Sequence, residues 1–296
     1  MKIIKRWALI LFSALLVGAA IFAVWNLDMV LRLLRAYQED SLTAQKIRYE
    51  LAAFNIGKRS PVTPVAQKTS SQDGMTQLYV PAGEFFMGRL NAKGTSGPQH
   101  VVYLDAFWMD RVEVSNAMYL MCMQAGGCTP LSSDNIWYRN WIYRDHPVVY
   151  VTWEQAKVYC EWAGRRLPTE AEWEKAGRGT DGRLYPWGDE PPTPSLANFA
   201  ESLIQESVSV YRYPLGASPY GALNMSGNAR EWTADWFDPE YYNASPYANP
   251  QGAPSGTERS LRSGSYNEDG REILITKRYN HEPQSAGLSR GFRCAE

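Results

Sequence analysis

The hydrophobic positions divide the chain into an amino-terminal apolar part and a longer part with short, mixed patterns. Residues 7–25 form an uncharged, mostly apolar run. A helix of that length spans roughly 28 Å, close to the thickness of the hydrocarbon core of a bilayer. Lys2, Lys5 and Arg6 precede the run, which places residues 1–6 in the cytoplasm by the positive-inside rule. We predict a retained anchor at 7–25, and a cleaved signal peptide is the alternative.

The predicted anchor makes the chain a single-pass protein of the cell membrane. It contacts the lipid bilayer through residues 7–25, and its main domain lies outside the cytoplasm. Apolar residues continue at helical spacing through 26–56, which predicts a helical stalk. Residues 57–74 are rich in Pro, Ser, Thr and Lys and indicate a linker. The globular domain is predicted to cover 75–296.

Short apolar segments at the start of this domain predict strands. Residues 78–80 and 85–87 flank a Pro-Ala-Gly turn and predict a hairpin, and 101–104 with 107–109 predict a second pair. Helix starts follow. Ser115 is expected to cap one helix, and Ser/Thr-x-x-Glu/Gln capping boxes at Thr152 and Thr169 predict two more. Beyond Gly177 the strand signals are short, so we predict an α+β fold with little regular secondary structure.

Composition and charge narrow the function classes. The chain has 296 residues, of which 45% are hydrophobic and 13% aromatic, enough for one large domain with an attachment segment. The formal net charge is −1, and no basic tract lies beyond the first few residues. A nucleic-acid-binding protein would carry a basic patch. We therefore expect no nucleic-acid partner.

The four cysteines fit an exported domain. Cys122 and Cys128 are close enough in sequence to close a tight loop through a disulfide. Cys160 and Cys294 remain as an even pair. Four free thiols are the alternative, and a metal site lacks support because no Cys-x-x-Cys motif is present.

The segment 224–236 combines a Gly-Asn turn with an acidic residue between tryptophans. Asn228 and Glu231 offer hard oxygen ligands, and the carbonyls of Gly227 and Ala229 can complete a cage of the kind that binds calcium. A buried Glu231 paired with an arginine explains the same pattern. The sequence leaves both interpretations open.

Seven stretches of the chain resemble, in order, the landmarks of the formylglycine-generating enzyme, or sulfatase-modifying factor, family. Together they extend over essentially all of the chain after the linker. The stretches are Phe85-Phe86-Met87-Gly88, Val112-Glu113-Val114-Ser115-Asn116, 164–174, Tyr185-Pro186-Trp187-Gly188, Gly227-Asn228-Ala229-Arg230-Glu231-Trp232, Gly264-Ser265-Tyr266 and Gly291-Phe292-Arg293-Cys294.

The resemblance implies a fold similar to C-type lectins, stabilised by disulfides and calcium. Cys160 and Cys294 match positions that the family joins, in agreement with their pairing by elimination. The resemblance also favours calcium, as a structural cofactor, at Gly227, Asn228, Ala229 and Glu231. Two further positions match the start of a second calcium site whose Asp-Gly continuation is missing here: Asn198 and Phe199.

The catalytic feature of the family is missing. Its enzymes hold copper through two cysteines that follow the Gly-Ser-Tyr landmark, because soft thiolates bind Cu(I). Residues 267–278 contain no cysteine here, so we expect neither copper nor the oxidase reaction. Two residues match the oxygen pocket of the enzymes, Trp232 and Ser265. With the acidic Glu268 and Asp269 they are expected to line the vacated cleft.

These observations lead to three hypotheses. The first is a non-catalytic, membrane-anchored extracytoplasmic domain that acts as an accessory or assembly subunit of a larger membrane complex. The aromatic loops 135–145 and 238–254 are its candidate contact regions. The alternative for these aromatic residues is packing into the domain's own core. The second is a lectin-like protein that binds a glycan or small ligand in the vacated cleft. The third, a formylglycine-generating oxidoreductase, is disfavoured by the missing thiolates.

Overall fold

A computed structural model describes residues 65–92, 94–131 and 137–296. The predicted anchor at 7–25, the stalk at 26–56 and most of the linker at 57–74 lie outside the described residues and stay predictions. Within the described ranges, no helix has both the length and the apolar character needed to cross a bilayer.

Regular elements are short, as the loop-rich α+β prediction required. The strands are β1 Gln67–Thr69, β2 Thr76–Val80, β3 Gly83–Met87, β4 His100–Leu104, β5 Phe107–Asp110, β6 Arg230–Trp236, β7 Arg259–Arg262, β8 Tyr279–His281 and β9 Arg290–Phe292. The helices are α3 Asn116–Gln124, α4 Trp153–Trp162 and α5 Glu170–Arg178, with 3₁₀ turns η1 Trp141–Tyr143, η2 Ala200–Ser202, η3 Pro214–Gly216 and η4 Tyr241–Asn243.

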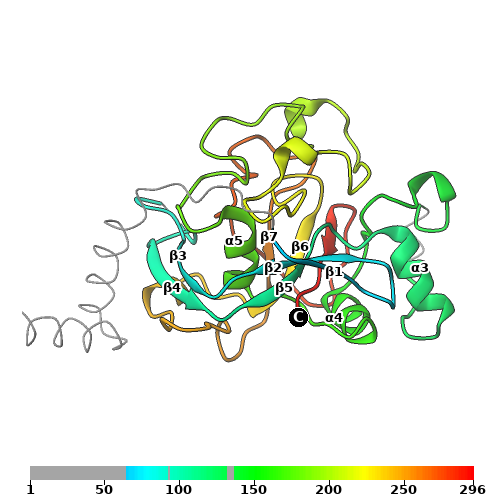
Figure 1. Cartoon of the computed structure of the whole chain (residues 1–296), viewed down its shortest axis with the longest axis horizontal. Helices are drawn as coiled ribbons and strands as arrows, with labels where there is room; N and C mark the ends of the chain where they lie inside the picture. The colour runs from blue at the N-terminus through cyan, green and yellow to red at the C-terminus, as the bar shows by residue number, and fades with distance from the viewer. Residues whose placement is uncertain (1–64, 93, 132–136) are drawn as a thin grey trace, which may run out of the picture. The chain divides into compact units, whose positions relative to one another are not determined.

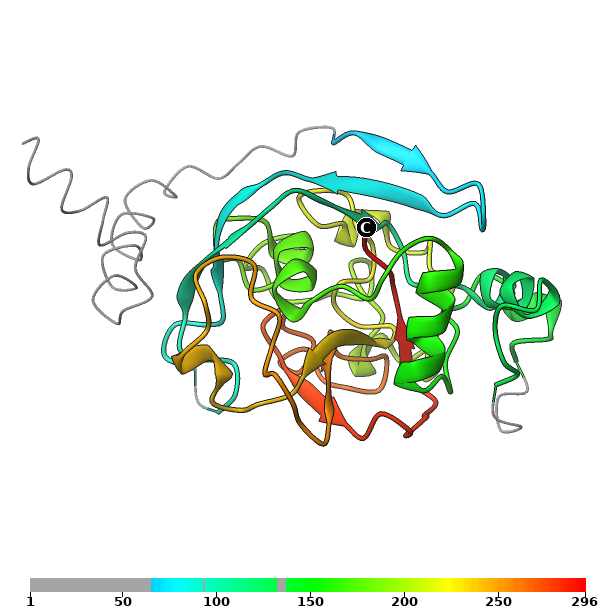
Figure 2. The same ribbon diagram turned by 90° about the horizontal axis from the view of Figure 1, so that it is seen from below.

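The first strands form one long, bent ribbon, which Figure 2 shows curving over one side of the domain in cyan and teal. β2 pairs antiparallel with β5, and β3 pairs antiparallel with β4. The register runs from Val80 opposite Phe107 to Gly83 opposite Leu104, so the pairing resumes after a bend. Pro81 sits at this bend and has no N–H to donate to a ladder. The predicted hairpin between 78–80 and 85–87 is therefore wrong, although the strands themselves are present.

The domain begins earlier than the predicted boundary at residue 75. β1 lies inside the segment assigned to the linker and pairs with β2. Asp73 is 4% exposed, and its carboxylate accepts hydrogen bonds from Tyr159 Oη at 2.7 Å and from Arg165. The polar composition of this segment suggested a linker because a buried aspartate and an exposed one look alike in sequence.

A second sheet has the order β8-β7-β6-β9. β6 is antiparallel to β7 and parallel to β9, so the carboxy-terminal strand lies beside the segment that contains Glu231 (Figure 1). The predicted helix starts are confirmed. Ser115 caps α3, and capping boxes at Thr152 and Thr169 open α4 and α5.

Helix α5 is buried along its whole length although most of its residues are polar. Burying a charged side chain is costly unless it is paired. Glu170 pairs with Arg278 at 2.8 Å, and Glu174 pairs with Arg178 at 2.7 Å and Arg262 at 2.6 Å. Lys175 donates to carbonyls at both ends of the ribbon bend, at 2.8 Å each. These contacts fix the bent ribbon on the helix.

Both predicted disulfides are present in the structure. Cys122 and Cys128 join the end of α3 to the loop that follows it, with Cα atoms 5.3 Å apart. Cys160 in α4 joins Cys294 after β9, with Cα atoms 5.7 Å apart. The second disulfide therefore closes a loop that contains most of the domain.

Candidate functional site

The segment predicted to bind calcium lies in a buried polar junction made by Glu113, Asn224, Asn228, Glu231 and Arg293. All five side chains are at most 4% exposed. Glu231 Oε1 accepts from Arg293 Nη2 at 2.7 Å, and Oε2 accepts from Arg293 Nε at 2.6 Å and Trp173 Nε1 at 2.7 Å. This is the arginine pairing that the sequence left open as the alternative.

Two further ligands of the predicted cage, Asn228 and the Gly227 carbonyl, also have partners within the protein. Asn228 Oδ1 accepts from Val208 N at 2.9 Å, and its Nδ2 donates to Glu113 Oε1 at 2.8 Å. The Gly227 carbonyl accepts from Ser263 Oγ at 3.3 Å, and Ala229 is fully buried. In the described parts of the chain, no group of three or more His, Cys, Asp or Glu side chains is arranged to hold a metal ion. The arrangement does not fit a calcium ion on Glu231, so calcium stays a prediction of the resemblance.

Asn198 and Phe199, the start of the predicted second calcium site, meet the same junction. Asn228 N donates to the Asn198 carbonyl at 2.8 Å. A Cβ at Gly227 would lie only 2.2 Å from that carbonyl oxygen, which explains why a glycine with φ of +88° stands there. Asn198 Oδ1 accepts from Ser202 Oγ at 2.9 Å, and Phe199 is a buried core residue. Asn198 therefore holds this loop against the residues just before β6, and Phe199 packs with Ile273 and Leu274.

Glu113 is the second carboxylate of the junction. It accepts from Asn224 Nδ2 at 2.7 Å and Asn228 Nδ2 at 2.8 Å. Burial, with a smaller contribution from the Glu231 carboxylate, raises the pKa of Glu113 to about 8. The junction thus holds two carboxyl groups around one guanidinium, and burial favours the protonated form of Glu113.

The four residues expected to line the vacated cleft do not come together. Trp232 is fully buried in the core, and its Nε1 donates to the Val151 carbonyl at 3.0 Å. Ser265 contacts Glu268 through its backbone N–H at 2.8 Å and its hydroxyl at 3.0 Å. Asp269 faces solvent, where the backbone N–H of Arg271 holds its pKa below the usual range. Of the four, Ser265 and Glu268 are joined by hydrogen bonds.

The carboxylate of Glu268, like that of Glu231, is paired with an arginine. It forms an ion pair with Arg230, whose guanidinium lies 4.1 Å from the centre of the Tyr279 ring. The Tyr279 hydroxyl donates to the Glu272 carbonyl at 2.8 Å. These contacts hold the acidic turn after the Gly-Ser-Tyr landmark against β6 and β8. The turn therefore presents no pair of free carboxylates for acid–base chemistry.

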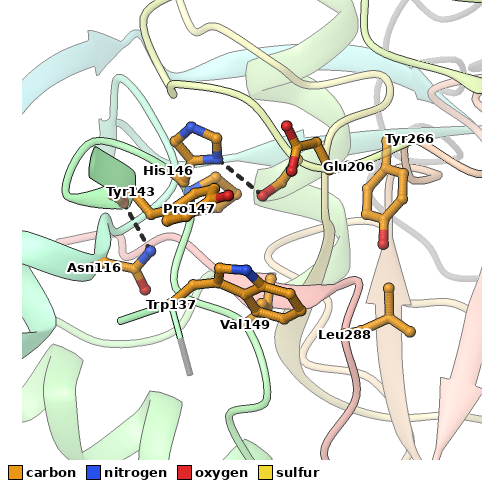
Figure 3. Close-up of a pocket in the computed structure, with 10 residues that line it drawn as sticks. Asn116, Trp137, Tyr143, His146, Pro147, Val149, Glu206, Tyr266 and Leu288 are labelled. Atoms are coloured by element: carbon orange, nitrogen blue, oxygen red, sulfur yellow. Dashed lines mark hydrogen bonds between the residues drawn. The ribbon is translucent and has the colours of Figure 1, made fainter. Parts of the chain in front are cut away.

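A pocket opens beside this turn, where Tyr266 faces the loop that follows α3 (Figure 3). It encloses about 40 Å³ and brings together five segments that are distant in sequence. The lining residues are Asn116, Trp137, Tyr143, His146, Pro147, Val149, Glu206, Ser207, Tyr266 and Leu288. A shallow groove of about 540 Å³ adjoins it and shares His146 and Glu206.

Part of this pocket is visible in the sequence. The aromatic loop 135–145 supplies Trp137 and Tyr143, whereas His146 belongs to no recognisable sequence motif. His146 Nδ1 is 3.3 Å from Ser207 Oγ, and its ring contacts Tyr143 edge-on at 4.9 Å. Burial lowers the pKa of His146, so the imidazole is neutral at pH 7.

Comparison with known proteins agrees with this fold and these landmarks. The model of the sulfatase-modifying factor enzyme 1-like domain matches residues 62–296. The chain belongs to this family. It is 33% identical over 295 residues to the formylglycine-generating enzyme of Streptomyces coelicolor, covering 78% of this chain and 91% of that protein.

Two further comparisons give a second relative in sequence and a solved structure with a similar fold. The chain is 31% identical over 286 residues to the serine/threonine-protein kinase pkn1 of Chlamydia pneumoniae; the match covers 87% of this chain but spans less than half, 45%, of that protein. The solved structure of PvdO from Pseudomonas aeruginosa superposes with a TM-score of 0.68 at 24% identity, covering 79% of this chain and 98% of that one. The latter likeness shows the formylglycine-generating-enzyme type of fold.

Proposed function

We propose that this chain is a non-catalytic member of its family that acts as an accessory or assembly subunit of a larger membrane complex. In this proposal residues 7–25 anchor it, residues 1–6 face the cytoplasm, and the domain lies on the extracytoplasmic side. Disulfides persist in oxidising compartments, and the two present here support that side of the membrane.

The observation that carries the loss of catalysis is the state of the cysteines. The sequence contains four, and all four are joined in disulfides. A disulfide sulfur offers no thiolate to Cu(I), and carboxylates are poor substitutes. Copper binding and conversion of a cysteine-containing sulfatase peptide should therefore both be absent. Either activity in the purified chain would overturn the loss of catalysis.

The two aromatic loops were considered for contact with a partner or for packing in the core, and they differ in exposure. In 238–254, Tyr242 is fully buried in the core. In 135–145, by contrast, η1 presents Trp141 at 78% and Ile142 at 63% exposure. Large apolar side chains this exposed and adjacent are typical of protein contact sites. We assign the surface of Trp141 and Ile142 to contact with another subunit of the complex.

The test is the native mass of the chain extracted from its own membranes in mild detergent, with mass spectrometry of the proteins that migrate with it. A stoichiometric assembly supports the proposal, and Trp141→Ser with Ile142→Ser should release the chain from it. Leu90→Ser, at a residue 58% exposed, is the matched control. A chain that migrates alone at about 33.5 kDa plus detergent would refute a stable assembly.

The second candidate function is binding of a small ligand or a glycan. The pocket beside Tyr266 favours a small ligand, and only the wider groove that adjoins it has room for a sugar. Calcium-dependent retention on immobilised sugars would support the lectin form of this candidate. Retention that persists in a chelator would separate ligand binding from calcium.

A further inference from the structure

The pocket beside Tyr266 contains a buried amide oxygen without a hydrogen-bond partner. Asn116 is 2% exposed, and its Nδ2 donates to the Tyr143 carbonyl at 2.9 Å. Because a carbonyl can only accept, the nitrogen must face Tyr143, and this fixes the orientation of the amide. The other atom, Oδ1, has no partner among the described residues. Buried acceptors are normally paired, so this oxygen indicates a missing donor.

Figure 3 shows the Asn116 oxygen on the side of the amide away from Tyr143, facing the space beside Trp137. The oxygen thus belongs to the pocket and not to the helix start that carries it. Nothing in α3 competes for it, because the capping of α3 uses Ser115.

The walls of the pocket favour a positive charge. Trp137 and Tyr143 meet edge-on, with ring centres 6.3 Å apart, and Tyr266 lies on the opposite side. Aromatic faces attract cations. Glu206 adds a carboxylate, and the residues that line the pocket include no Lys or Arg. His146 is neutral at pH 7 because burial lowers its pKa.

The dimensions of the pocket and its adjoining groove favour a ligand with a small head group on a longer stem. A volume of about 40 Å³ holds roughly three water molecules, which is too little for a sugar ring. The adjoining groove is wider, and its apolar lining includes Ile204, Val208 and Tyr211. A head group can therefore enter the pocket while an aliphatic stem follows the groove.

We propose that this pocket binds a protonated primary amine, with one N–H donated to Asn116 Oδ1 and the charge placed among Trp137, Tyr143 and Glu206. This site goes beyond the assembly role and does not depend on it. The shared chemistry has two sources, a free alkylamine or the lysine side chain of a partner chain.

The test is calorimetric titration of the full chain in mild detergent with three probes of similar shape. These are n-butylammonium, n-butyltrimethylammonium, which has no N–H, and neutral n-pentanol. n-Butylammonium should bind about tenfold more tightly than n-pentanol, because the cation meets aromatic faces and a carboxylate. Equal binding of these two, or no heat from any probe, overturns the proposal and leaves the pocket to water.

Variants separate the hydrogen bond from the charge. Asn116→Ala should weaken n-butylammonium about tenfold and leave n-butyltrimethylammonium unchanged, since the latter cannot donate to the oxygen. Equal weakening of both probes contradicts the role of Asn116. Should that variant fail to fold, Glu206→Gln carries the test, because Glu206 is exposed. It should weaken both cations and not n-pentanol, and Glu201→Gln, outside the pocket, should change nothing.

A lysine derivative separates the two sources. Nα-acetyl-lysine methylamide should bind several times more tightly than n-butylammonium if a partner chain supplies the lysine, and no more tightly if a free amine is the ligand. Both outcomes retain the amine site. A chain with no native assembly that still binds n-butylammonium would refute the assembly role alone.

Discussion

Replacing Arg293 by methionine removes the guanidinium that holds both oxygens of Glu231. Arg293 is fully buried, and it also donates to the carbonyl of Leu223 at 2.8 Å. Methionine replaces the aliphatic stem of Arg293 but not its guanidinium, so the main cost is an unpaired buried carboxylate. Breaking one side of a buried ion pair typically costs about 3–5 kcal/mol. We therefore expect Arg293→Met to lower the free energy of unfolding by about 4 kcal/mol at pH 7.

Urea denaturation at pH 7 measures this change, provided that the m-value stays constant. Arg271→Met is the matched control. Its side chain is 88% exposed and pairs with Asp269 only at 3.7 Å, so it should cost less than about 0.5 kcal/mol. A loss below about 1 kcal/mol in Arg293→Met, or a loss restored by calcium, would refute the ion-pair account.

Other parts of the structure give further expectations. The folded-state pKa of Glu113, about 8, lies above its unfolded value. Its contribution to stability is therefore full below pH 4.5 and falls as pH rises toward 8, by at most about 1.4 kcal/mol per pH unit. Glu113→Gln should flatten the curve of stability against pH over that window, and an unchanged slope would contradict the burial of this proton. Because Arg293 occupies Glu231, a chelator should leave the melting temperature unchanged, whereas a calcium-dependent rise in melting temperature would favour the calcium site. Removing the Cys160–Cys294 disulfide by a double serine substitution should lower the free energy of unfolding by up to about 5 kcal/mol. The same change at Cys122–Cys128 should lower it by about 2 kcal/mol, because the loop that this disulfide closes is much shorter. Equal losses in urea titrations would count against that ranking.

Local features of this protein were predictable from the sequence. Capping at Thr152 and Thr169 depends on contacts three residues apart, so the helix starts follow from neighbouring residues alone. The order of the family landmarks likewise requires no coordinates. The Cys160–Cys294 disulfide followed from parity and agreed with the family pattern.

Long-range pairing was not predictable in the same way. A strand pattern does not state its partner, and the bend at Pro81 sends β2 to β5 instead of β3. The sequence offered Glu231 either calcium or an arginine, and only the parallel pairing of β6 with β9 places Arg293 against it.

The pocket beside Tyr266 shows the same division. The sequence singled out the aromatic loop before His146 but could not say which of its rings face solvent. Five separate segments converge at the pocket, and the unpaired oxygen of Asn116 becomes visible only when its neighbours in space are known. Residue types and local spacing determined the family and its missing thiolates. Burial and chain topology decided which charges are neutralised and which polar atom is left to bind a ligand, because those depend on contacts between residues far apart in the chain.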